Sequence, residues 1–152
     1  MRVLVVCLGN ICRSPLAEAA FRREAEEAGL EVDTDSAGTG DWHVGEPPDP
    51  RAQATAKEHG IDISGYRGRQ VTARDFAEYD LVLAMDHENL ANLEKLRPDD
   101  ARADLALLLD EVEGRGGEAV ADPYFGGDEG FATTWSDVST AARALVERLQ
   151  RG

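Results

Sequence analysis

The fold of this chain follows from residues 2–20, RVLVVCLGNICRSPLAEAA. Residues 2–6 are mostly apolar and β-branched, as is typical of a buried strand in a parallel sheet. A short glycine-containing loop follows, and Pro15 suits the first position of a helix for which Ser14 is the expected N-cap. This order of strand, loop and helix start predicts an anion site, because the first amides of a helix lack intrahelical acceptors.

The same loop carries side chains suited to chemistry on a phosphate-like anion. The dipole at the helix start favours negative charge, and therefore the thiolate form of Cys7, which makes Cys7 a candidate nucleophile. Arg13 offers a planar fork of donors that matches a tetrahedral oxyanion. A lone cysteine is more often a small apolar core residue. Its position after a strand and before a helix start favours catalysis instead.

Length and charge limit the possible classes of protein. A chain of 152 residues fits one domain, residues 1–152, and 42% hydrophobic residues suffice for a core. The net charge of −14 argues against nucleic acid or an anionic membrane as a partner. An acidic protein that binds phosphate must therefore build its positive potential locally, from loop amides and a few arginines.

The cysteines and histidines point away from structural metal or disulfide chemistry. Both cysteines, Cys7 and Cys12, lie in the loop, which excludes a disulfide scaffold. No Cys/His spacing resembles a zinc site, so we expect no metal and no cofactor, with His43, His59 and His87 structural or on the surface. The apolar start is too short for a signal peptide or a membrane span, and we expect a cytoplasmic protein.

Beyond residue 20 the pattern alternates between strands and helices. It predicts strands over 31–35, 79–85 and 103–109, and helices over 15–28, 50–60, 86–96 and 131–149, with a weaker helix start at 72–75. The expected fold is a single three-layer α/β domain with a four-stranded parallel sheet, helices on both faces and a phosphate-binding loop after the first strand. Ligands of such sheets bind at the carboxyl ends of the strands, where Cys7 lies.

A long loop rich in glycine and proline follows the second predicted strand, over residues 36–48. Loops of this length without structure of their own are usually functional or disordered. An embedded Trp42 indicates a packed, functional loop. Trp42 itself is either a core residue or part of a binding cleft.

The motifs resemble those of one family. Five residues separate Cys7 from Arg13, Ser14 follows directly, and Asp122-Pro123-Tyr124 lies near the other end. This arrangement is similar to the low-molecular-weight protein tyrosine phosphatases. Residues 35–39, 42–45, 48–52 and 84–86 also match, so the resemblance covers essentially the whole chain.

The resemblance implies a phosphatase that acts on phosphotyrosine or similar aryl phosphates. Cys7 would attack phosphorus and form a cysteinyl-phosphate, Arg13 would clamp the phosphate, and Asp122 would act as general acid and then general base. The partners implied are a tyrosine-phosphorylated protein as substrate and inorganic phosphate as product. We expect a monomer that binds neither nucleic acid nor membrane.

The resemblance also assigns the residues around the nucleophile. The phosphate-binding loop comprises Leu8, Gly9, Asn10, Ile11, Cys12 and Ser14. Asn10, Ser14 and Ser36 would support the loop by hydrogen bonds, with Asp86 in the same supporting group. The walls of the substrate cleft would be Trp42, Tyr124 and Phe125.

Three positions bear on how closely the chain follows the family. Phe125 stands where relatives often have a second tyrosine, and Tyr66 stands where some have a histidine that supports the loop. The network around the loop is therefore expected to be rewired. Ile11 is the phosphotyrosine-type residue, since phosphoarginine phosphatases of the same fold look to have threonine there.

Several alternatives remain at the level of sequence. Cys12 either packs under the loop or forms a reversible disulfide with Cys7. Asp122 is by default a turn residue and Tyr124 an exposed loop residue. The whole chain is alternatively an arsenate reductase that uses a small thiol, because no cysteine follows Cys12, or a phosphate-binding module without turnover.

Overall fold

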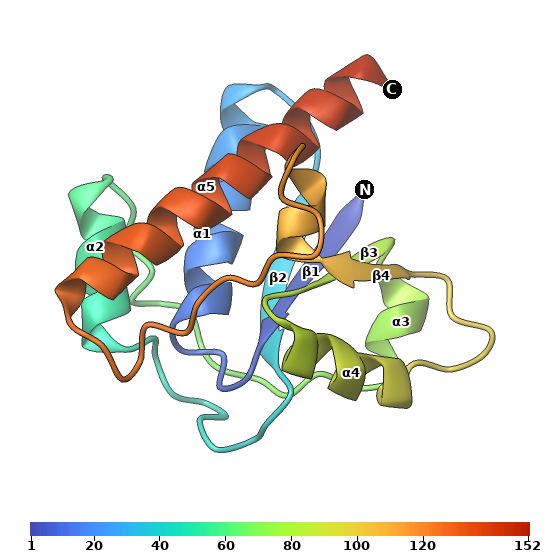
Figure 1. Ribbon diagram of the computed structural model, residues 1–152, viewed down its shortest axis with the longest axis horizontal. Helices are drawn as coiled ribbons and strands as arrows, with labels where there is room; N and C mark the ends of the chain where they lie inside the picture. The colour runs from blue at the N-terminus through green and yellow to red at the C-terminus, as the bar shows by residue number, and fades with distance from the viewer.

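The structure is a computed structural model that describes residues 1–152 except for the side chain of Asp128. Its elements, drawn in Figure 1, are β1 (Arg2–Cys7), α1 (Arg13–Glu27), β2 (Asp33–Gly38), α2 (Pro50–Glu58), α3 (Asp75–Glu78), β3 (Leu81–Ala84), α4 (His87–Leu96), β4 (Asp104–Leu107), the 3₁₀ helix η1 (Leu108–Glu111) and α5 (Asp128–Arg151).

The four strands form one parallel sheet in the order β2-β1-β3-β4. Figure 1 shows α1, α2 and α5 on one side of this sheet and α3 and α4 on the other. This three-layer arrangement confirms the predicted α/β fold. Because β1 is a central strand, its carboxyl end places Cys7 in the middle of the sheet edge where ligands bind.

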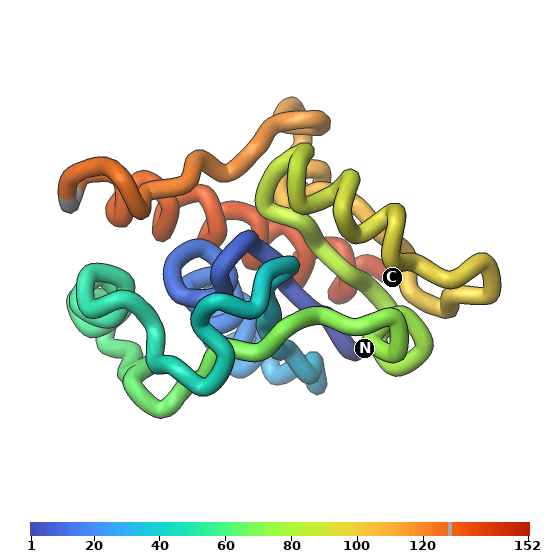
Figure 2. The backbone as a smooth tube through the Cα atoms, turned by 90° about the horizontal axis from the view of Figure 1, so that it is seen from below, coloured from blue at the N-terminus to red at the C-terminus, as the bar shows by residue number. Residues whose placement is uncertain are grey.

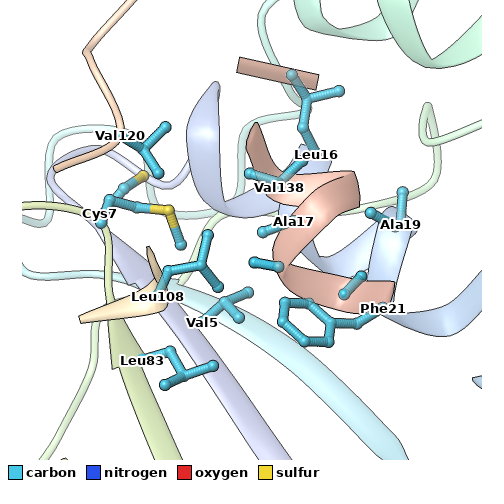
Figure 3. Close-up of a cluster of buried hydrophobic side chains, with 14 of the residues drawn as sticks. Val5, Cys7, Leu16, Ala17, Ala19, Phe21, Leu83, Leu108, Val120 and Val138 are labelled. Carbon is cyan, nitrogen blue, oxygen red and sulfur yellow. The ribbon is translucent and has the colours of Figure 1, made fainter. Parts of the chain in front are cut away.

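Burial on both faces explains why β1 is apolar throughout. Val3 and Val5 are fully buried in the cluster that contains α1 and α5, which is drawn in Figure 3 together with Cys7. Leu4 and Val6 are fully buried in the cluster on the other face. Each buried valine or leucine side chain stabilises the fold by about 1.5–3 kcal/mol, so a polar residue in β1 is strongly disfavoured.

The second strand differs from the sequence prediction. It was expected at 31–35 but runs over Asp33–Gly38, because it pairs with β1 along its whole length, from Arg2 with Asp33 to Cys7 with Gly38. The start of the predicted long loop is thus part of the sheet. Glycine is required at 38, since a Cβ there would lie 2.8 Å from the carbonyl oxygen of Leu8.

The other two strands are shorter than predicted. β3 covers only Leu81–Ala84, and β4 ends at Leu107, after which the chain turns into η1 instead of continuing to residue 109. Asp110 stabilises this turn because its carboxylate accepts the amide of Leu107 at 3.1 Å. The apolar pattern is the same for a strand and for a buried 3₁₀ turn, so the sequence could not separate them.

The starts of α2 and α4 follow the prediction within one residue, whereas α1, α3 and α5 begin elsewhere than predicted, α5 at residue 128 instead of 131. Asp49 caps α2, as the Asp-Pro start predicted, and accepts a backbone amide at 2.8 Å. Asp86 caps α4 in the same way at 2.8 Å, although the prediction made it the first residue of that helix. The N-cap of α1 is Cys12, without a side-chain cap, so the expectation that Ser14 caps it is wrong. α3 is a single turn that begins at Asp75 rather than near residue 72.

α5 is the longest helix and closes one side of the molecule. Phe131, Val138 and Leu145 of its predicted apolar stripe are buried in the core cluster with α1. None of the helices in the described residues is both long and apolar enough to cross a membrane.

Candidate active site

Three segments that are distant in sequence meet at the carboxyl end of β1. Figure 2, seen from below, shows the loop between β1 and α1 lying between the segment that follows β2 and the segment that leads into α5. A pocket of about 170 Å³ opens there. Its lining consists of Cys7, Leu8, Gly9, Ile11, Cys12, Arg13, Trp42, His43, Asp122, Tyr124 and Phe125.

Two donors converge on the sulfur of Cys7, which is itself buried. The amide of Asn10 donates to Cys7 Sγ at 3.2 Å, and Ser14 Oγ lies 3.0 Å from the sulfur. Asn10 Nδ2 donates to Ser14 Oγ at 2.8 Å, which leaves the serine its own hydrogen to give. The sulfur lies nearer to this hydroxyl than the carbonyl oxygen of Ala37, which is 3.5 Å away, so Ser14 is placed to donate to a Cys7 thiolate and stabilise its charge.

Asn10 keeps the loop in a strained conformation. Its φ is +59°, a left-handed value that costs a residue other than glycine on the order of 1–3 kcal/mol. The Asn10 side chain offsets this strain, since Nδ2 also donates to Ser36 Oγ at 3.0 Å and Oδ1 accepts the amide of Arg69 at 3.0 Å. Positions 10, 14 and 36 are thus joined as the resemblance implied, and position 69 was not expected from the sequence.

A buried carboxylate ends this chain of hydrogen bonds, and sequence reasoning missed it. Ser36 Oγ donates to Glu18 Oε1 at 2.7 Å, and Arg22 Nη2 lies 2.6 Å from the other carboxylate oxygen. Burial raises the pKa of Glu18 to about 7. A charged residue within the otherwise apolar start of the first helix was the signal that this side chain has a buried role.

Tyr66 lies in the same region, but among the described residues its side chain makes no hydrogen bond to the phosphate-binding loop. The guanidinium of Arg22 lies over the Tyr66 ring, 5.2 Å from its centre, and burial raises the pKa of the Tyr66 phenol. The network therefore runs from the loop through Ser36 and Glu18 to Arg22, with the Tyr66 ring stacked beneath the arginine.

The backbone of the loop presents free donors. In the described part of the chain, the amides of Gly9 and of residues 11–14 have no acceptor within the protein. These amides lie at the N-terminus of α1, where the helix dipole also favours negative charge. The loop is therefore suited to hold a tetrahedral oxyanion in front of Cys7.

Arg13 is buried and held by two other elements. Its Nη1 donates to Asp86 Oδ2 at 2.8 Å and to the carbonyl oxygen of Val120 at 2.9 Å. Asp86 Oδ1 meanwhile caps α4, so this carboxylate fixes the arginine and the helix together. Arg13 Nη2 lies 3.7 Å from Asp122 Oδ2, which leaves the second arm of the guanidinium at the pocket.

Asp122 combines the turn expected for an Asp-Pro sequence with a place in the pocket. Its Oδ1 accepts the amide of Tyr124 at 3.0 Å, while Oδ2 faces Arg13. Arg51 holds the segment from the other side, because its guanidinium donates to the carbonyls of Tyr124 at 3.0 Å and Gly126 at 3.3 Å. The match to the family at residues 48–52 included Arg51 but did not reveal this contact.

Aromatic side chains form the rim of the pocket. Trp42 is 66% exposed, so the alternative that it is a core residue is wrong. Tyr124 and Phe125, 40% and 92% exposed, pack edge to face with ring centres 4.9 Å apart. All three line the pocket, as the resemblance implied, and Phe125 brings a ring without a hydroxyl.

Cys12 and His43 complete the lining. Cys12 is a free thiol in the core cluster, and burial raises its pKa far above the usual value, which favours the protonated form. Its reversible disulfide with Cys7 stays a prediction. His43 was expected to be structural or on the surface, but it lies at the pocket, with Nδ1 3.1 Å from Glu46.

No metal-binding arrangement is evident among the side chains that the structure describes. In that part of the molecule, His, Cys, Asp and Glu side chains do not gather in groups of three or more that could hold an ion.

Comparison with known proteins identifies close relatives. A family profile described as "Low molecular weight phosphotyrosine protein phosphatase" matches residues 2–152. The chain is 47% identical over 134 residues to a Schizosaccharomyces pombe protein of that name, covering 86% of this chain and 85% of the relative. The solved structure of YfkJ from Bacillus subtilis has 38% identity and a TM-score of 0.91, covering 99% of this chain and 95% of YfkJ.

A solved Drosophila arginine phosphatase is also similar, although less so in sequence. Its identity to this chain is 32%, its TM-score is 0.92, and the alignment covers 99% of this chain and 98% of the other. The same fold is therefore found in a protein described as an arginine phosphatase.

Proposed function

Because the chain belongs to the low molecular weight phosphotyrosine protein phosphatase family, we propose that it hydrolyses phosphotyrosine in proteins and releases inorganic phosphate. The observation that carries this proposal is the pocket in which Cys7, Arg13 and Asp122 meet. These three groups are the nucleophile, the anion clamp and the proton donor that phosphoryl transfer through cysteine requires.

In the first step the Cys7 thiolate attacks phosphorus in line with the leaving oxygen. The S–P bond forms as the P–O bond to the tyrosine breaks, and Asp122 gives its proton to the departing phenolate. The amides at residue 9 and residues 11–14, together with Arg13, stabilise the charge on the phosphoryl oxygens. The product of this step is a cysteinyl-phosphate.

In the second step a water molecule attacks the phosphorus of the cysteinyl-phosphate. Asp122, now a carboxylate, accepts the proton of this water, and the S–P bond breaks to release phosphate. The amide of Asn10 and the hydroxyl of Ser14 stabilise the negative charge that returns to the Cys7 sulfur. Neither step uses a metal or a cofactor.

The lining of the pocket supports an aryl phosphate as substrate. Trp42 and Tyr124 are aromatic walls against which a tyrosine ring can pack, and Ile11 adds an apolar surface. A phosphoarginine substrate would bring a charged guanidinium into this apolar lining, where its desolvation is unfavourable. We therefore place phosphotyrosine ahead of phosphoarginine for this chain.

The surroundings of the site also support the proposed partners. The net charge of −14 disfavours nucleic acid, so the macromolecular partner is a phosphoprotein. Catalysis through Cys7 requires a reduced thiol, which supports a reducing compartment such as the cytoplasm. We further propose that the single domain acts as a monomer.

The test compares the wild type and Cys7→Ser on four substrates with a metal chelator present. The substrates are an aryl phosphate, an alkyl phosphate, phosphoarginine, and arsenate with a small thiol. We expect turnover of the aryl phosphate by the wild type only, and binding of inorganic phosphate by both proteins.

Other outcomes would replace the proposal with a specific alternative. Appreciable turnover by Cys7→Ser would overturn the assignment of the nucleophile. Consumption of arsenate without phosphatase activity would indicate a reductase, and anion binding without any turnover would indicate a binding module.

A further inference from the structure

A second depression adjoins the active-site pocket. It has a volume of about 420 Å³ and lies between residues 39–42 and one face of α4. Leu8 and Trp42 line both the pocket and this depression, which we call the α4 groove. The two spaces are therefore neighbours that share these two side chains.

The α4 groove has an apolar floor. Val71 and Leu93 are buried beneath it, and Leu8 and Leu96 border it, each with 36% of its surface exposed. Within the described residues, every exposed large apolar side chain except Met1 and Val44 lines either the pocket or this groove. Exposed apolar surface gathered in one place usually marks a binding surface.

The Trp42 ring forms part of the wall between the pocket and the groove. The Trp42 ring packs directly on Gly40, since a Cβ at position 40 would overlap three atoms of the ring. One face of the ring thus lies against the backbone, although most of its surface is exposed. It gives the pocket and the groove a common edge.

The far side of the groove is one face of α4. Glu88, Asn92 and Leu96 recur every four residues, so their side chains lie along the same side of the helix. Among the described residues, Glu88 has no ion-pair partner within the chain. The groove therefore offers an apolar floor with one free negative charge at its rim.

We propose that the α4 groove binds the polypeptide next to the phosphotyrosine of the substrate. An apolar side chain of that polypeptide packs over Leu8 and Leu96, and a basic side chain pairs with Glu88. This inference rests on the proposed function, since the occupant is the continuation of the chain whose phosphotyrosine fills the pocket. An extended peptide advances about 3.3 Å per residue, so residues two or three positions away reach a neighbouring site.

The continuity of the two spaces favours this occupant over an unrelated ligand. A phosphotyrosine seated against Cys7 leaves the pocket past its rim, and Leu8 and Trp42 are the part of the rim that borders the groove. The overall charge of the chain and the free carboxylate of Glu88 both favour a basic rather than an acidic flanking segment.

The test uses phosphotyrosine peptides in which leucine, and separately arginine, replaces alanine at each position flanking the phosphotyrosine in turn. For the wild type we expect leucine at one position to raise kcat/KM by about threefold to tenfold, the gain from partly burying one aliphatic side chain. Arginine at another position is expected to raise kcat/KM by about twofold to fivefold.

Two pairs of variants on α4 separate the groove from the rest of the helix. Leu96→Asn should abolish the gain from leucine, whereas Lys95→Asn, next to it but outside the groove, should preserve it. Glu88→Lys should abolish or reverse the gain from arginine, whereas Glu94→Lys, exposed on the opposite side of α4, should preserve it. All four variants should hydrolyse a small aryl phosphate within about twofold of the wild type, since that substrate fills only the pocket.

The outcomes distinguish this inference from the function on which it rests. If the wild type hydrolyses the aryl phosphate but its kcat/KM for peptides does not depend on the flanking residues, the role of the groove is overturned and the proposed function stands. The proposed groove would also be overturned if Leu96→Asn kept the preference for a flanking leucine and Glu88→Lys kept the preference for a flanking arginine. A wild type without activity on the aryl phosphate would overturn the proposed function, and the inference with it.

Discussion

The two sides of the active-site pocket are built in different ways. On the side of the nucleophile, Cys7, Asn10 and Ser14 are all buried and joined to one another by hydrogen bonds. On the opposite side, the Asp122 side chain is 37% exposed, and the neighbouring Phe125 is almost entirely exposed. One side is part of the core, and the other is a surface segment that reaches the same pocket.

This difference matches the demands of the proposed chemistry. Charge stabilisation requires donors fixed before the substrate arrives, which a loop between a central strand and a buried helix provides. Proton transfer requires access for the substrate and exit for the product, so an exposed segment serves it better. Substitutions on the two sides should therefore act differently on substrates with good and poor leaving groups.

After Cys7→Ser, which should abolish turnover, Asp122→Asn should have the largest effect on kcat/KM. The amide keeps the turn but has no proton to give, so kcat/KM for poor leaving groups should fall by about a hundredfold to ten-thousandfold. Good leaving groups need little protonation and should lose far less. The measurement is kcat/KM over aryl phosphates of graded leaving-group pKa. An equal loss across the series would exclude Asp122 as the general acid.

Ser14→Ala should have the next largest effect on kcat/KM, and unlike Asp122→Asn its effect should not depend on the leaving group. Loss of one hydrogen bond to a charged sulfur, worth about 1.5–3 kcal/mol, should lower kcat/KM by about tenfold to a hundredfold for all leaving groups alike. Ser139→Ala is a matched control, because in the described structure this buried hydroxyl has no partner. If Ser14→Ala acts only on poor leaving groups, the two sides of the pocket are not functionally distinct.

Arg51→Met should have a smaller effect, confined to the Asp122 side. It removes the donors to the carbonyls of Tyr124 and Gly126 while keeping much of the apolar stem. We expect kcat/KM for poor leaving groups to fall by about threefold to tenfold, the value of one net hydrogen bond. Arg74→Met, which removes an exposed ion pair on α3, should change nothing. A uniform loss over all leaving groups would show that Arg51 acts on the whole site instead.

Glu18→Gln should have the smallest effect on turnover and a clear effect on stability. The folded-state pKa of Glu18 is about 7, above the ordinary 4.5, because burial disfavours its charge. Its protonation favours folding, so its contribution to the free energy of unfolding should be lost as the pH rises from about 4.5 to about 7. The shift corresponds to at most on the order of 3 kcal/mol.

Urea unfolding of wild type and variant across this pH range checks the prediction for Glu18. The wild type should lose stability relative to Glu18→Gln as the pH rises. Glu26→Gln, an exposed glutamate on the same helix, should follow the wild type. Parallel pH curves for the wild type and Glu18→Gln would show that Glu18 does not titrate in this window.

Much of the fold was predictable because its signals are local. The valine-rich run of β1 and the Asp-Pro start of α2 each lie within a few residues of the element they define. The errors occurred where pairing with a distant segment decided the outcome. β2 runs to Gly38 because β1 offers partners up to Cys7, and nothing near residue 38 indicates a strand.

The residues of the candidate site likewise divide into those that local sequence predicts and those that depend on contacts with distant segments. Cys7, Arg13 and the free amides follow from the strand, loop and helix order of residues 2–20, because backbone connectivity alone brings them together. The family resemblance implied that Ser36 and Asp86 support the loop, but only the tertiary structure shows that Asp86 anchors Arg13 itself. Only the tertiary structure decides that Arg69 also holds Asn10 and that Arg51 holds the Asp122 segment. Such contacts depend on how the elements pack in three dimensions, which spacing along the chain does not encode locally.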